Sequence, residues 1–259
     1  MKKNDVGVSE YTDLKQQIFR ELLKMHIRIV RGILPRNEWA DQRYWYIDLT
    51  AGPGKYDGHV GSPVIFHEEI EEAGMPYSAI LFERGQKFYE SLSKYFEEMK
   101  NSGQVTGKVG IFDKPYQEGK KYTDFKRYRY GLIYIDPSGG LPDFDYLGDI
   151  SKYKANQYMD FLINISATNV KRIRKSPDTD FSENLMELLG KLDKKHWLVR
   201  EPYAKHQWTM LIGTNWDAFP KFKGRRFFRT NEPEGRDILQ RLSMTTSEYE
   251  EAYQLTLFN

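Results

Sequence analysis

Hydrophobic residues follow two different spacings along the chain. Over residues 9–34 they recur every three or four positions, as on one face of a helix, and Pro35 ends this pattern. After residue 43 they gather in short continuous runs, which are typical of buried strands. The predicted strands are 44–49, 79–83, 107–113, 131–136, 161–165, 196–202 and 208–214, and further helices are predicted over 62–73, 86–100 and 235–254.

This order of elements predicts the fold class. Strands that alternate with helices form βαβ units and a mostly parallel sheet. The connection between 196–202 and 208–214 is too short for a crossover, so the last strand should be antiparallel. We therefore expect an α/β, Rossmann-like fold with seven strands. The predicted parts are an N-terminal helical segment (1–43), a core (44–214) and a basic, aromatic C-terminal extension packed on the core (215–259).

The composition of the 259 residues removes several kinds of chemistry. The absence of cysteine excludes disulfides, Cys-ligated zinc and thiolate nucleophiles. The five histidines show no spacing typical of metal ligands, so no metal site is expected, although His59 lies close to a candidate loop. A net charge of +2 predicts no strong polyelectrolyte behaviour and leaves local patches open. Aromatic residues make up 15% of the chain, which suits a packed core or surfaces for ring stacking.

The sequence also bears on localisation. No apolar run approaches the roughly 20 residues that cross a bilayer. The first residues lack the apolar stretch of a signal peptide. We expect a cytoplasmic protein with no membrane partner.

The segment AspLeuThrAlaGlyProGlyLys (48–55) is the strongest functional signal. It follows a buried run, and its small residues allow the backbone to approach a ligand closely. It lacks the GxxxxGK[ST] pattern of a P-loop and the third glycine of GxGxxG, so a nicotinamide dehydrogenase becomes a distant alternative.

Acidic residues close the next three predicted strands. In open parallel sheets ligands bind beyond the carboxyl ends of the strands, so Glu83, Asp113 and Asp136 should lie at the same edge. A carboxylate at Glu83 could accept hydrogen bonds from ribose hydroxyls, and one at Asp113 from an adenine amino group, with Phe112 as an alternative adenine contact. Pro137 holds Asp136 in an extended conformation, where it could act as a base, an acceptor or a cofactor contact.

Residues 44–214 together resemble the class I S-adenosylmethionine-dependent methyltransferases. The resemblance implies a seven-stranded sheet with an antiparallel last strand and S-adenosylmethionine as cofactor. It implies the methionine part near Asp48, Thr50, Ala51, Gly52, Pro53 and Gly54, the ribose at Glu83, the adenine at Phe112 and Asp113, and Asp136 at the edge of the substrate pocket. The candidate catalytic residues are Asp136, Pro137 and Ser138.

A narrower resemblance is to the three-Cys-motif partner proteins. It rests on 46–56, GlySerPro (61–63), ThrAspLeuLys (12–15), IleAspProSerGlyGly (135–140) and LeuIleAsnIle (162–165). That family is methyltransferase-like with a poorly defined substrate, and its cysteines belong to the partner. Thr50 stands where the family loop usually has Phe.

The residues after the fourth strand bear on what is methylated. Enzymes that methylate adenine N6 or cytosine N4 carry the pattern [DNS]-Pro-Pro-aromatic after the corresponding strand, and its aromatic residue stacks on a flipped base. Here Ser138 and Gly139 replace the second proline and the aromatic residue, so the stacking ring would come from elsewhere, for example Tyr56 or Tyr203. Cytosine C5 methylation needs a cysteine nucleophile and is excluded.

Two basic segments indicate nucleic acid, DNA or RNA, as the partner. In 171–175 and 221–229 cations could follow phosphates while the phenylalanines of the second segment stack on bases. Another basic and aromatic stretch is LysArgTyrArgTyr (126–130). Alternatively, the basic segments are ordinary solvated surfaces balanced by acidic residues elsewhere, which the small net charge favours. The candidate substrate contacts are Tyr56, Asn164, Lys171, Arg172, Arg174, Arg225 and Arg226.

Three hypotheses of function follow. The first is a methyltransferase for a nucleic-acid base nitrogen, adenine N6 or another, as in DNA modification, in which Asp136 orients the nucleophile or accepts its proton. The second is a methyltransferase for a small molecule or a protein. The third is a binding module that keeps the fold, serves a partner protein and has no turnover.

Overall fold

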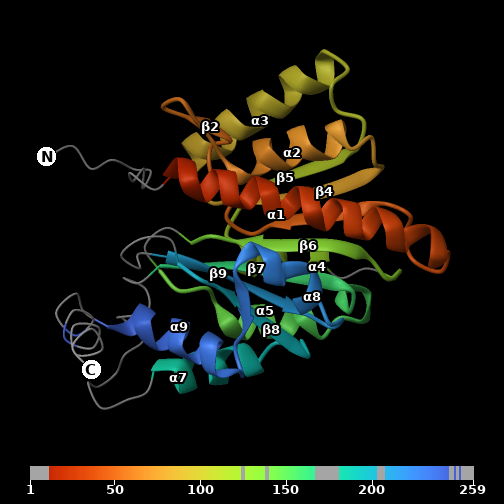
Figure 1. Ribbon diagram of the computed structural model, residues 1–259. Helices are drawn as coiled ribbons and strands as arrows, with labels where there is room; N and C mark the ends of the chain where they lie inside the picture. Colours follow the sequence, from red (N-terminus) through yellow and green to blue (C-terminus); the bar gives the residue numbers. More distant parts are fainter. Residues whose placement is uncertain are drawn as a thin grey trace, which may run out of the picture. The chain divides into compact units, whose positions relative to one another are not determined.

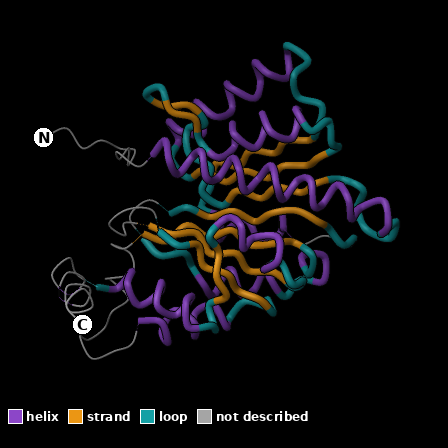
Figure 2. Tube along the Cα trace, viewed as in Figure 1, coloured by secondary structure: helices purple, strands orange, loops and turns teal. Residues whose placement is uncertain are grey.

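The computed structural model describes residues 12–123, 126–137, 140–166, 181–202 and 208–244, with the single residues 248 and 251. The chain forms two compact units, which Figures 1 and 2 show with their helices and strands. Unit 1 comprises Met1–Ser138 and Ile150–Asp160, and unit 2 comprises Gly139–Asp149 and Phe161–Asn259.

Unit 1 contains four parallel strands in the order β6-β1-β4-β5. The central strand β1 is buried along its whole length, which explains its uninterrupted apolar and aromatic sequence. Asp48 lies beside Leu81 and Tyr134, and Glu83 lies beside Asp113, so the carboxyl ends of the strands meet at one edge. The bounds are β1(Tyr44–Asp48), β4(Tyr77–Glu83), β5(Lys108–Asp113) and β6(Tyr130–Ile135).

Helices and a small hairpin complete unit 1. The apolar stripe of the first helix is buried, and its Phe19 packs against Tyr134 with ring centroids 4.5 Å apart. The elements are α1(Thr12–Ile33), η1(Leu34–Arg36), α2(Ser62–Glu72), α3(Gln86–Asn101), η2(Tyr116–Gly119), α4(Lys120–Thr123) and η3(Lys154–Asn156), with β2(Lys55–Tyr56) paired to β3(His59–Val60).

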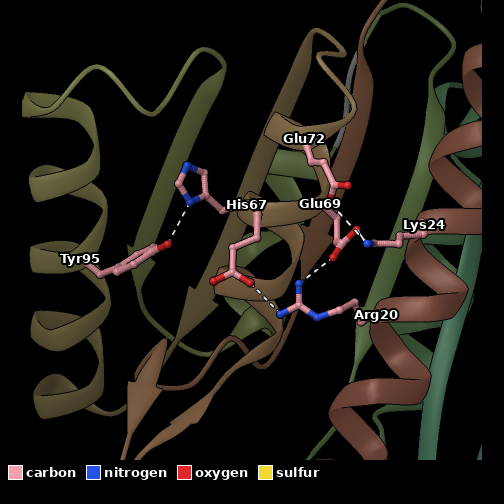
Figure 3. Close-up of polar contacts among 7 residues, drawn as sticks. Arg20, Lys24, His67, Glu69, Glu72 and Tyr95 are labelled. Carbon is pink, nitrogen blue, oxygen red and sulfur yellow. Dashed lines mark hydrogen bonds and ion pairs between the residues drawn. The ribbon is translucent and has the colours of Figure 1, made fainter.

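Ion pairs join α1 to α2 (Figure 3). The carboxylate of Glu69 has a side-chain exposure of only 2% and lies 2.6 Å from Arg20 Nη1 and 3.2 Å from Lys24 Nζ. A buried carboxylate is destabilising unless it is paired, so this cluster fixes how the two helices pack. On the other side of α2, His67 Nδ1 lies 2.9 Å from Tyr95 Oη on α3.

Unit 2 contains four strands in the order β10-β8-β9-β7. Strands β7 and β8 run in the same direction, with β9 antiparallel to both of them, and β10 is antiparallel to β8. The elements are α5(Phe144–Ser151) and β7(Met159–Ser166), both of which begin or end in unit 1, α7(Phe181–Gly190), β8(His196–Arg200), β9(Trp208–Thr214), α8(Phe219–Phe222), η4(Lys223–Arg225), β10(Phe227–Arg229) and α9(Pro233–Ser243).

The predicted fold class is confirmed: an α/β, Rossmann-like fold with an antiparallel strand after β8. Besides the β2–β3 hairpin, the described residues form eight strands and not the predicted seven, because the three residues of β10 pair with β8. The helix predicted over 235–254 is interrupted, since α9 ends at Ser243 and Met244 is extended, although the described residues Glu248 and Glu251 are helical. Among the described residues, no helix combines the length and apolar character needed to cross a membrane.

Candidate functional site

The loop after β1 is held between the two neighbouring strands. Leu49 N donates to the carbonyl of Tyr134 at 3.0 Å, and Ala51 N donates to that of Phe82 at 2.9 Å. Gly52 and Gly54 then have φ values of +68° and +77°, a conformation that favours glycine. These constraints explain why the segment after Asp48 is rich in small residues.

Asp48 shapes this loop from within the protein. Its side chain is fully buried, and Oδ2 accepts hydrogen bonds from Tyr46 Oη at 2.7 Å and Ser62 Oγ at 2.6 Å. Oδ1 accepts the N–H of Thr50 at 3.0 Å. Burial raises the pKa of Asp48 to about 6, although the three hydrogen bonds lower it. The carboxyl therefore connects β1, the loop and the first residue of α2.

Glu83 joins the loops that follow β1 and β4. Its Oε2 accepts the N–H of Gly52 at 2.8 Å, and its Oε1 accepts the N–H of Gly85 at 2.6 Å. Each carboxylate oxygen has a second lone pair, so the half-buried group keeps capacity for two more hydrogen bonds. An ideal Cβ on Gly52 would meet nothing within 4 Å, so space is open beside this junction.

Asp136 is bound to the first helix. Lys15 Nζ on α1 lies 2.6 Å from its Oδ2, and Tyr134 Oη donates to the same oxygen at 3.3 Å. The backbone N–H of Asp136 donates to Thr50 Oγ1 at 2.8 Å. The end of β6 is thus joined both to the loop after β1 and to α1. Sequence reasoning did not find Lys15 as a site residue, because 121 positions separate it from Asp136.

The other candidates of unit 1 lie around this edge. Phe112 packs on Phe82 with centroids 5.4 Å apart and an interplanar angle of 28°. Asp113 is exposed, and Pro137 is half-buried. Ser138 lies outside the described residues. We name as the strand-end cluster Asp48, Thr50, Ala51, Gly52, Pro53, Gly54, Glu83, Phe112, Asp113, Asp136 and Pro137.

The hairpin β2–β3 also reaches α1. His59 Nδ1 lies 2.9 Å from Asp13 Oδ1, so the one histidine near the candidate loop is in contact with the start of the helix. Tyr56, the candidate stacking ring, is 36% exposed on β2.

The candidates in unit 2 are placed separately. Asn164 is buried in β7, and Arg225 is exposed at the end of η4. Arg226 binds Glu201 through Nη2 at 2.8 Å. The other substrate candidates, Lys171, Arg172 and Arg174, and the alternative ring Tyr203 lie outside the described residues.

One expectation about 221–229 is wrong. Two of its three phenylalanines, Phe222 and Phe227, are buried and contact each other with ring centroids 5.4 Å apart. They cannot stack on bases, because β10 and the end of α8 place them in the core of unit 2. The aromatic residues between these cations therefore belong partly to the short strand β10, and not to a surface for base stacking.

Chemically, the strand-end cluster offers acceptors and donors to one polar ligand. Glu83 can accept from hydroxyl groups, the loop presents backbone close to open space, and Asp136 with Lys15 forms a carboxylate–ammonium pair.

Comparisons with known proteins agree on the fold. No family model and no curated protein matches the chain. Among solved structures, DszA carbon methyltransferase is similar with a TM-score of 0.51 at 9% identity, over 80% of this chain and 55% of that one. Protein LPL1258 from Legionella pneumophila has a TM-score of 0.50 at 14% identity, over 78% of this chain and 88% of that one. A putative rRNA-methylase from Clostridium thermocellum has a TM-score of 0.44 at 13% identity, over 79% and 96%.

The fold and the comparisons define the class: an α/β protein with the Rossmann-like fold found in methyltransferases. The narrower assignment to the three-Cys-motif partner family stays a prediction from the sequence motifs, since no family model matches.

Proposed function

We propose that the protein is an S-adenosylmethionine-dependent methyltransferase. The observation that carries the proposal is the junction at Glu83, whose carboxylate binds the N–H groups of Gly52 and Gly85 at the carboxyl ends of two neighbouring parallel strands. Ligands of open α/β sheets bind at such an edge. The fold shared with a carbon methyltransferase supports the same reaction class.

The residues present fit this cofactor. The spare lone pairs of Glu83 suit two ribose hydroxyls, and the open space beside Gly52 leaves room for the methionine part along the loop. Phe112 would face the adenine ring, and exposed Asp113 would accept from its amino group. Asp48 would hold the loop without touching the ligand. When bound, S-adenosylmethionine supplies an activated methyl group.

For the substrate we propose a nucleic-acid base nitrogen, with adenine N6 among the candidates. Asp136 would accept a hydrogen bond from the amino group, orient its lone pair for in-line attack on the methyl group and then take up the proton that the nitrogen loses. Lys15 would position Asp136 through the 2.6 Å contact. The half-buried Pro137 directly follows Asp136 at the end of β6, so it would lie beside the same amino group.

A calorimetric titration with S-adenosylmethionine and S-adenosylhomocysteine tests the cofactor. We expect micromolar binding to the unmodified protein and its loss in Gly52→Asp, which puts a second carboxylate beside Glu83. Gly74→Asp is a matched control, because Gly74 also has a positive φ and open space but lies before β4, at the other end of the strand. Absence of binding to the unmodified protein would refute the proposal.

Transfer of a labelled methyl group to single-stranded and duplex DNA and RNA tests the substrate. Asp136→Asn should abolish transfer and leave cofactor binding largely intact, because Asp136 is assigned to the nucleophile. Methyl transfer that persists in Asp136→Asn would refute the catalytic assignment of Asp136. Cofactor binding with no transfer to any nucleic acid would instead favour the alternatives, a small-molecule or protein substrate or a module without turnover.

A further inference from the structure

Four aromatic side chains gather at the opposite edge of unit 1, where β1 and β6 begin. The centroid of the Trp39 ring lies 5.0 Å from that of Tyr128 and 5.2 Å from that of Tyr158. Tyr130 stacks on Tyr158 at 5.1 Å with an interplanar angle of 23°. We call Trp39, Tyr128, Tyr130 and Tyr158 the aromatic cluster. Two of these residues belong to the basic and aromatic stretch 126–130, which the proposed methyl transfer does not use.

Backbone hydrogen bonds hold the cluster in shape. Asp41 N donates to the carbonyl of Tyr128 at 2.9 Å, and Arg129 N donates to that of Ala155 at 3.1 Å. The buried guanidinium of Arg129 also donates to Asn156 Oδ1 at 2.7 Å. Three segments far apart in the sequence are therefore fixed beside one another, so a ligand would meet a preformed surface.

The cluster remains partly open to solvent. Trp39 is 48% exposed, more than any other large apolar side chain in the described part of the chain, and the three tyrosines are half-buried. Moving large aromatic side chains out of water lowers the free energy. A contiguous exposed group of them therefore marks a binding surface.

Cations surround these rings. Lys154 Nζ lies 5.4 Å from the centroid of Tyr128, and Arg36, Lys126 and Arg127 are exposed on the same segments. No ion pair between described residues involves Arg36, Lys126 or Lys154, and Arg127 lies close enough to Asp41 to help lower the pKa of that carboxyl. The segments 36–43, 126–130 and 152–158 contain seven basic residues and two acidic ones, Glu38 and Asp41. Asp41 is paired with Arg43 at 2.7 Å.

We propose that the aromatic cluster and its cations bind single-stranded nucleic acid. Unpaired bases can stack on Trp39 while phosphates lie near Arg127, Lys126 and Lys154. A duplex hides its base faces, so it would use the cations alone. The inference rests on the proposed function for its substrate class, and it adds a docking surface at the end of unit 1 away from the strand-end cluster.

Fluorescence anisotropy with labelled 15-nucleotide single strands of RNA and DNA, and with a duplex of the same length, tests the inference. We expect Trp39→Ala to weaken single-strand binding about 5- to 150-fold, the range for losing one stacked base. Trp39→Phe should retain most of the affinity because a ring remains. Arg127→Gln should weaken binding and lower its salt dependence, whereas Lys94→Gln on α3, the control cation, should do neither.

Each outcome decides the inference. Single-strand affinity that Trp39→Ala leaves unchanged, or a loss that Lys94→Gln reproduces, overturns it, and so does a complete lack of single-strand binding. Comparison of the RNA and DNA arms identifies the strand that is bound. If Trp39→Ala lowers the melting temperature, its loss of binding could come from unfolding. In that case a loss of single-strand binding in Arg127→Gln and Lys154→Gln supports the inference, and unchanged binding overturns it. Titration with S-adenosylmethionine tests the proposed function separately, because it uses no nucleic acid.

Discussion

The buried carboxyl of Asp48 should make the protein less stable at neutral than at mildly acidic pH. Burial raises its pKa from the usual 3.8 to about 6. Because the pKa of the folded state lies above that of the unfolded state, folding disfavours the ionised form. The cost is complete above pH 6, falls as the pH drops through 6, and disappears below the unfolded-state pKa. Asp48→Asn removes the ionisation and should remove this dependence.

The magnitude follows from the pKa shift. A shift of about two pKa units corresponds to about 3 kcal/mol at pH 8 and about 1.6 kcal/mol at pH 5, so the linkage changes by about 1.4 kcal/mol over this range. An asparagine can keep the hydrogen bonds of the site. Its Oδ1 accepts from Thr50 N, and its Nδ2 donates to the hydroxyls of Tyr46 and Ser62, which can accept as well as donate.

Urea unfolding of both proteins at several pH values between 5 and 8 measures the effect. We expect Asp48→Asn to gain in stability relative to the unmodified protein as the pH rises, by about 1.4 kcal/mol across the range. Asp113→Asn, which changes an exposed carboxyl at the end of β5, should show no such gain. A difference between Asp48→Asn and the unmodified protein that stays constant with pH would refute the reasoning.

Two further predictions concern packing in each unit. Arg20→Met should destabilise unit 1 by about 1–3 kcal/mol, since it leaves the buried carboxylate of Glu69 with only Lys24. Lys94→Met, in an exposed ion pair, should change the stability little. Chemical denaturation of both variants checks this, and equal effects would contradict it. Gly213→Ala should cost about 1–3 kcal/mol and lower the melting temperature, because its Cβ would lie 2.5 Å from the Trp197 ring. The melting temperature of Gly190→Ala, where the space is open, should not fall.

The sequence predicted much of the fold because buried strands form continuous apolar runs. It also located Glu83 and Asp136, since strand ends at one edge of a parallel sheet follow from topology alone. It could not show that Asp48 is fully enclosed, because that depends on Tyr46 and Ser62 closing around it. The hydrophobic pattern identifies the strand but not the neighbours of the carboxyl at its end.

The hydrophobic pattern could not predict contacts between residues far apart in the sequence. Lys15 reaches Asp136 only because α1 packs on β6, and nothing in the local sequence of either residue records that contact. The aromatic cluster was missed for the same reason, because Trp39 and Tyr158 are brought together by backbone pairing. Strand β10 was missed since three residues between cations give no clear period.

The length of α1 sets the distance that a nucleic acid would have to cover to occupy both ends of unit 1. Its 22 residues make a rod of about 33 Å, since an α-helix rises 1.5 Å per residue. Lys15 lies near its first residue, and the chain reaches Trp39 six positions after its last one, Ile33. A nucleic-acid strand that kept the stacked duplex spacing of about 3.4 Å per nucleotide would cover this length with about ten nucleotides. Under the proposed function a mononucleotide would therefore occupy one end only, and in a longer strand bound at both ends the modified base would lie near one border of the footprint.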